Sequence, residues 1–119
     1  MKENNRDRFV NYKREDSWTP LLIASSGGHF EIVKVLIQNK ANIETSTKNN
    51  ITPLFHACMH GPSEIVKFLI KHKANIEILN NNGWTPLFYA CVSKQSAIAN
   101  ALIQNKANIE TSTKNNITP

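Results

Sequence analysis

The residues best suited to chemistry are two histidines with a cysteine between them. His56 and His60 lie four residues apart on a segment expected to be helical, a spacing that zinc can use. A zinc protease would also carry Glu directly after the first histidine, where this chain has Ala57. No third ligand is near in the sequence. We therefore expect no metal site.

The two cysteines, Cys58 and Cys91, are 33 residues apart. Helices stacked in successive units lie about 8–10 Å apart, whereas a disulfide needs Cα atoms within about 7 Å. We therefore predict free thiols that act as small core residues.

The glycine-rich stretch at 25–28 (Ser-Ser-Gly-Gly) joins two expected helices instead of following a strand, so it lacks the context of a phosphate-binding loop. No nucleophile elbow and no pair of acidic residues in an apolar setting is visible. The sequence thus predicts no enzyme, with no catalytic residues and no cofactor.

Charge and hydropathy exclude two further classes of protein. The net charge of +5 is spread along 119 residues, whereas nucleic-acid binding favours a clustered basic face with aromatic side chains. No segment approaches the ~18 consecutive apolar residues of a membrane helix, and residues 1–8 lack the apolar centre of a signal peptide. We expect an intracellular, cytoplasmic setting, without nucleic acid and without membrane insertion.

An internal repeat organises the whole chain. Thr-Pro recurs every 33 residues, at 19–20, 52–53, 85–86 and 118–119, and Leu, Ala and Ala-Asn-Ile-Glu keep the same step. Residues 36–53 are identical to residues 102–119, so this part of the sequence arose by duplication.

Each unit is predicted to be a pair of helices. Thr before Pro suits a helix start, which gives first helices at 20–26, 53–60 and 86–92 and second helices at 30–39, 63–72 and 96–105. In the first unit we expect the buried side to carry Ile32, Val33, Val35, Leu36 and Ile37. A single pair cannot cover its apolar faces, so neighbouring units must stack into a solenoid.

The pattern resembles the ankyrin repeat, whose signature is Thr-Pro-Leu-His-x-Ala at this period. The chain reads Thr-Pro-Leu-Leu-Ile-Ala at 19–24, Thr-Pro-Leu-Phe-His-Ala at 52–57 and Thr-Pro-Leu-Phe-Tyr-Ala at 85–90. The resemblance covers about residues 9–119. It implies an all-α ankyrin-repeat solenoid of stacked helix-turn-helix units joined by β-hairpin-like loops.

The resemblance also implies a division of the chain. We expect an N-terminal arm at 1–16, partly disordered, with residues 1–7 loose and the second half abutting the first repeat. Repeats follow at about 17–49, 50–82 and 83–115, and a fourth, truncated repeat begins at 116–119. On this basis the chain is interpreted as a fragment of a longer array.

Three sets of residues depart from the family pattern. The signature His is replaced by Leu22, Phe55 and Phe88. The Gly that ends the second helix is replaced by Lys40, Lys73 and Lys106, and the hairpin Gly by Ser17, Asn50 and Asn116. A left-handed turn at lysine is strained, so those turns are expected to differ or to cost stability.

In ankyrin repeats the hairpin tips and the first helices line a concave face that binds partners. Carried over by position, the partner-binding candidates are Asp16, Trp18, Ser26, Lys48, Asn49, Ile51, Met59, His60, Asn81, Asn82, Trp84, Val92 and Ser93. The two Trp have two readings, as exposed binding residues or as packing between hairpins. A ladder of Lys40, Lys73 and Lys106 beside Glu44, Glu77 and Glu110 is read as a stripe for an acidic partner or as a solvated face.

These observations favour a protein-interaction module, or adaptor, that binds an unidentified protein through the concave face. The alternative is a structural spacer or self-assembling segment of a larger scaffold. A third possibility is a targeting arm of an effector domain outside this sequence. A monomer is expected, with association possible through an uncapped C-terminal end.

Overall fold

The computed structural model describes the backbone of residues 5–114 and the side chains of residues 6–105. This part of the chain forms seven helices: α1 (Asn5–Val10), α2 (Pro20–Gly27), α3 (Phe30–Gln38), α4 (Pro53–His60), α5 (Ser63–Lys71), α6 (Pro86–Val92) and α7 (Ser96–Lys114). The first helices of all three units and the second helices of the first two agree with the predicted bounds to within one residue.

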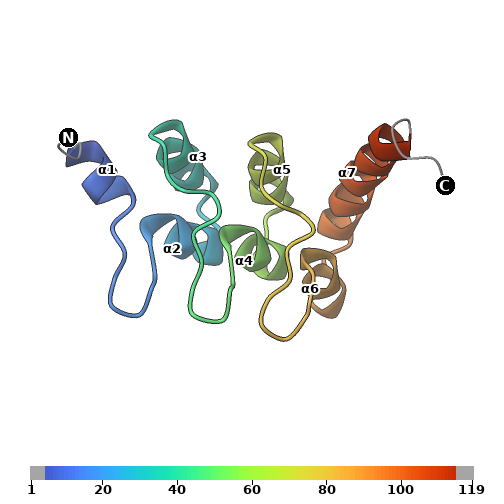
Figure 1. Ribbon diagram of the computed structural model, residues 1–119, viewed down its shortest axis with the longest axis horizontal. Helices are drawn as coiled ribbons and strands as arrows, with labels where there is room; N and C mark the ends of the chain where they lie inside the picture. The colour runs from blue at the N-terminus through green and yellow to red at the C-terminus, as the bar shows by residue number, and fades with distance from the viewer. Residues whose placement is uncertain (1–4, 115–119) are drawn as a thin grey trace.

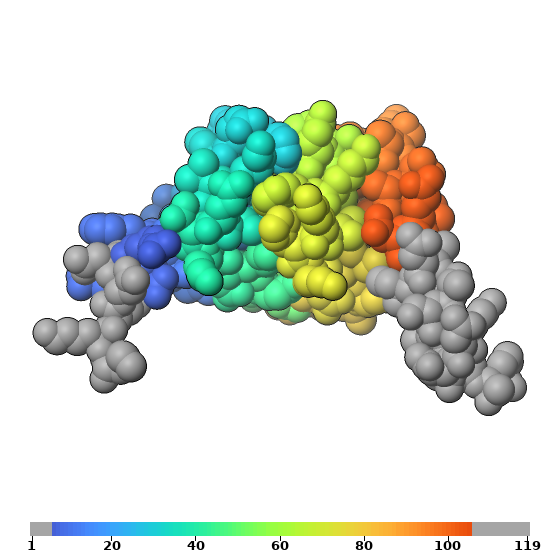
Figure 2. Space-filling model, turned by 90° about the horizontal axis from the view of Figure 1, so that it is seen from above, coloured from blue at the N-terminus to red at the C-terminus, as the bar shows by residue number. Residues whose placement is uncertain are grey.

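The helices form two rows joined by loops, as Figure 1 shows. The first helices of the units, α2, α4 and α6, form the inner row, and α3, α5 and α7 form the outer row. The molecule is elongated, with extents of 48 × 34 × 27 Å, and the repeats follow one another as bands along its long axis (Figure 2). The predicted all-α solenoid is confirmed.

Threonine and proline start each inner helix. The side-chain oxygen of Thr19 accepts a hydrogen bond from the amide of Leu22 (3.3 Å), and that of Thr85 accepts one from Phe88 (3.2 Å). The proline that follows has no N–H to leave unpaired. At the signature-His position, Leu22 and Phe55 are fully buried. The starts of α2 and α6 are therefore held by threonine caps and packing, whereas Thr52 makes no such cap bond and α4 relies on packing.

The outer helices α3 and α5 end in left-handed turns although glycine is absent. Lys40 has φ 75° and Lys73 has φ 78°. After each of them an alanine amide donates back to a helix carbonyl, Ala41 to Leu36 at 2.9 Å and Ala74 to Leu69 at 3.0 Å. A left-handed residue with a Cβ costs roughly 1–2 kcal/mol, so the expected strain is present and the turn is kept.

The prediction for the third outer helix is wrong. It was expected to end near residue 105, but α7 continues to Lys114 and passes through Lys106 without a turn. The sequence of residues 106–114, helical here, is repeated at 40–48, where it forms a turn and a loop. There the loop is tied to the next repeat, since the Asn50 amide group donates to the Leu79 carbonyl at 2.8 Å. No described repeat follows α7, so nothing offsets the cost of the left-handed turn. Residues 115–119, including Asn116, lie outside the described residues.

Repeat stacking also explains why two side chains of α3 are more exposed than predicted. Val33 and Ile37 are buried as expected, but Ile32 and Val35, which were also expected to be buried, are 52% and 55% exposed. Ile32 lines a pocket at the N-terminal end of the array, where no described repeat precedes it.

The N-terminal arm contributes the short helix α1. Its first residues, 5–7, were expected to be loose but are helical. Val10 packs against the core, and the Asn11 side chain bonds the Lys40 carbonyl (3.2 Å) and the Asn42 amide (2.8 Å). The arm is thereby fixed to the end of α3.

Candidate functional site: the hairpin face

The three loops that precede the inner helices share one hairpin geometry. In each, an amide donates to the carbonyl four residues later: Arg14 to Trp18 at 2.8 Å, Thr47 to Ile51 at 3.0 Å and Asn80 to Trp84 at 3.0 Å. The residue before the last has positive φ in every case, being Ser17, Asn50 or Gly83. No strand is assigned among the described residues, so these are hairpin-shaped loops.

Neighbouring hairpins are joined to each other by asparagines. The Asn81 amide donates to the Asn49 carbonyl at 3.1 Å, and the Asn81 side chain donates to the Lys48 carbonyl at 3.3 Å. Together with the bond from Asn50 to Leu79, these contacts fix the second and third tips side by side.

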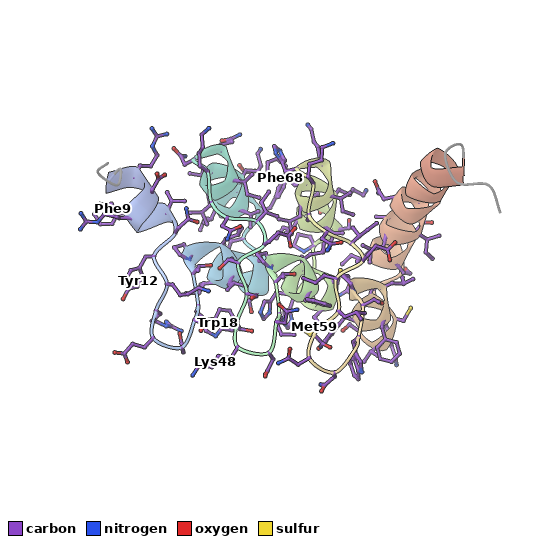
Figure 3. The ribbon with its side chains drawn as sticks, viewed as in Figure 1. Phe9, Tyr12, Trp18, Lys48, Met59 and Phe68 are labelled. Carbon is purple, nitrogen blue, oxygen red and sulfur yellow. The ribbon has the colours of Figure 1, made fainter. Side chains whose placement is uncertain are left out.

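A pocket of about 420 Å³ lies between these two tips and above α4 and α6. We call it the hairpin pocket. Its size is within the range of ligand sites in proteins. Five of the predicted binding residues line it: Asn49, Ile51, Met59, Asn81 and Asn82. Figure 3 shows Met59 beside α4 and Lys48 on the second loop.

Three further residues of the lining, His56, Asn80 and Tyr89, were not among the predicted binding residues. Asn80 organises the third hairpin: its side-chain oxygen accepts from the amides of Asn82 and Trp84 at 2.9 Å, and its amide group donates to the Tyr89 hydroxyl at 2.6 Å. The run Asn80–Asn82 signalled a turn, but nothing in the sequence distinguishes its buried first residue from the exposed two.

His56 is the most unusual of these residues. Its side chain is buried, at 8% exposure, and neither ring nitrogen has a hydrogen-bond partner. Trp18 packs against it with ring centroids 4.9 Å apart, and the His60 ring is stacked at 6.4 Å. Burial, and then the nearby His60, lower the pKa of His56 to about 4. The imidazole is therefore neutral near pH 7.

The two tryptophans are partly buried, and each packs on aromatic rings of an inner helix. Trp18 packs on His56 of the next repeat. Trp84 packs on its own repeat, with ring centroids 4.5 Å from Phe88 and 5.1 Å from Tyr89. Each Trp thus joins a hairpin to an inner helix.

The other predicted residues lie outside the hairpin pocket. Asp16 accepts from the Arg14 guanidinium at 2.8 Å, and that hydrogen bond lowers the pKa of Asp16. Lys48, His60 and Val92 are exposed, whereas Ser26 and Ser93 are half-buried. The structure therefore gathers five of the thirteen candidates around one pocket and leaves the others distributed along the face.

Side chains are described for two of the three lysines in the predicted ladder. Lys40 and Lys73 are exposed, while Lys106 has no described side chain. A Glu44 side-chain oxygen accepts from the Asn75 amide at 2.8 Å. This acidic residue therefore bonds the next repeat's backbone.

The cysteines are both free thiols. Cys58 is fully buried, and burial raises its pKa to about 12. Cys91 is exposed, so its predicted role as a core residue is wrong. The reason is the same as for Ile32, namely a missing neighbour. The repeat after α4 covers this face of α4, but no described repeat follows α6 and α7.

Among the residues whose structure is described, no group of three or more His, Cys, Asp or Glu side chains is placed to hold a metal ion. None of the helices in that part of the chain is long and apolar enough to cross a membrane.

Helix pairs repeated every 33 residues, with hairpin tips gathered on one face, define a helical-repeat protein of the solenoid class. A family model described as ankyrin repeats (3 copies) matches residues 2–78 and 40–113. The chain belongs to the ankyrin-repeat family. Comparison with curated proteins gives no match. Ankyrin repeats are generally protein–protein interaction modules.

Proposed function

We propose that this chain binds a partner protein through the concave face of hairpin tips and inner helices, with the hairpin pocket as the central contact. The supporting observation is the pocket itself, which brings Asn49, Met59 and Asn82 together from three separate elements. We also propose that the chain divides into an arm at residues 1–16 and repeats at 17–49, 50–82 and 83–115.

The lining indicates what kind of group the pocket takes. It consists of amide, phenol, imidazole and apolar side chains. With His56 neutral, every side chain in the described lining is uncharged. A buried imidazole without hydrogen bonds gains by pairing with a polar group. An uncharged donor or acceptor of the partner, such as a peptide amide or a Gln, Asn or Ser side chain, suits this site better than a phosphate or a carboxylate.

The test compares two triple variants with the parent chain. The pocket variant carries Asn49→Ala, Met59→Ala and Asn82→Ala. The control variant carries Lys67→Ala, Lys71→Ala and Glu64→Ala on the exposed side of α5. Trp18 and Trp84 are left intact because both pack against helices, and their removal would disturb folding. Each variant must first match the parent in its circular dichroism spectrum.

Immobilised parent chain is used to capture proteins from a lysate of the source cells, and the captured protein is then titrated against all three chains. We expect the pocket variant to bind it at least about tenfold more weakly and the control to bind it like the parent. Equal binding by all three chains would exclude the hairpin pocket.

A further inference from the structure

A second pocket, also of about 420 Å³, lies at the N-terminal end of the array beside α2. We call it the N-terminal pocket. Its lining is mostly apolar and includes Tyr12, Trp18, Pro20, Ile23, Ala24 and Ile32. Figure 3 shows Tyr12 and Trp18 flanking this end of the inner row. It is separate from the hairpin pocket.

The repeat register identifies what this pocket lacks. Ile32, Ile65 and Ile98 are equivalent positions, and their exposed fractions are 52%, 0% and 1%. Likewise Ile23 is 47% exposed, whereas the equivalent His56 is 8% exposed. In the second and third repeats the preceding repeat lies against these helices: α4 and α6 pack on the preceding inner helix, and α5 and α7 on the preceding outer helix. The N-terminal pocket therefore has the shape of a vacant inner-helix position.

The opposite end of the molecule carries the complementary surface. Phe88 is 47% exposed, whereas the equivalent Leu22 and Phe55 are fully buried against the following repeat. Cys91 is exposed, whereas the equivalent Ser25 and Cys58 are fully buried. The α6 helix thus presents the face with which α2 and α4 cover their neighbours.

We propose that two copies of this chain associate head to tail, with α6 of one copy docking in the N-terminal pocket of the other. The contact continues the interface that already joins α2 to α4 and α4 to α6. Charge does not oppose it, because α6 has no charged residue and the one charged residue of the pocket lining, Arg14, is paired with Asp16.

The geometry also sets the strength and the form of this association. Figure 1 shows α1 beside α3, on the side of the array that a preceding outer helix would occupy. In the docking copy α7 packs on α6 and has to share this space with α1, so the interface is smaller than one within the chain. The surfaces in contact are different on the two copies, so the contact does not close and further copies can add.

Sedimentation velocity from about 10 µM to about 1 mM tests this proposal. The pocket at the N-terminal end is blocked in one variant by Ile23→Lys with Ile32→Lys, and the α6 face in another by Phe88→Glu. All three side chains are about half exposed, so folding is preserved. The parent is expected to associate with rising concentration, and each variant to associate at least about tenfold more weakly.

Mixing the two variants is the decisive measurement. Each retains one intact surface, so the mixture should form a one-to-one dimer that does not grow further. In the parent, alkylation of Cys91 should slow as association proceeds. Met59→Ala, in the hairpin pocket, should leave association unchanged. A parent that stays monomeric to about 1 mM, blocked variants that associate like the parent, or a mixture that stays monomeric would each overturn the proposal.

Discussion

His56 ties the stability of the molecule to pH. Its imidazole is buried without hydrogen bonds, and its pKa falls from 6.5 in the unfolded chain to about 4. Between these values the unfolded state binds a proton that the folded state does not, so acid favours unfolding. We expect the free energy of unfolding to fall by up to about 2 kcal/mol between pH 7 and pH 4.5.

Urea unfolding at the two pH values measures this effect, with His56→Leu as the test variant and His60→Gln as its control. His56→Leu should remove most of the dependence. His60→Gln should keep it, because burial is the larger cause of the shift at His56. A pH dependence unchanged in His56→Leu would assign the effect to other groups.

Among the helices, the position of a residue in the array decides how much its side chain contributes to the free energy of unfolding. Ile32 and Ile65 are the same residue type in the same register of α3 and α5, yet Ile32 is half exposed and Ile65 is fully buried. We expect Ile65→Val to lower the free energy of unfolding by about 1 kcal/mol and Ile32→Val to change it by less than about 0.5 kcal/mol.

The matched pair is measured by urea unfolding under one set of conditions, at a protein concentration low enough to keep the chain monomeric. Equal losses for the two variants would mean that Ile32 is covered within the monomer.

Helix starts and the repeat register could be predicted because they depend on local chemistry, such as Thr before Pro in each unit. The end of α7, the exposure of Ile32 and the exposure of Cys91 could not. Each depends on whether a neighbouring repeat is present, and the same residues behave differently inside the array and at its ends. The hairpin pocket shows the same division. Its tip residues followed from the register, but His56 and Asn80 acquire their roles only from packing across repeats.

For the whole molecule, stacking predicts a gradient of local stability. Each repeat contacts its neighbours alone, and α4 and α5 have a described repeat on either side. Hydrogen exchange followed by mass spectrometry should be at least about tenfold slower in α4 and α5 than in α1 and the last turns of α7. Uniform protection over all helices would instead mean that the array unfolds as one unit.

The duplicated stretch has a consequence for how this gene can change length. Residues 36–53 and 102–119 are identical and lie two whole periods apart. Unequal crossing-over between the corresponding DNA would delete or insert two complete repeats without a frame shift and without a new junction sequence. The turn and hairpin encoded by the exchanged stretch would keep their residues, whereas the inner helix before the exchange would pack on a different neighbour. The length of the array can therefore vary in steps of two repeats while the 33-residue register stays the same.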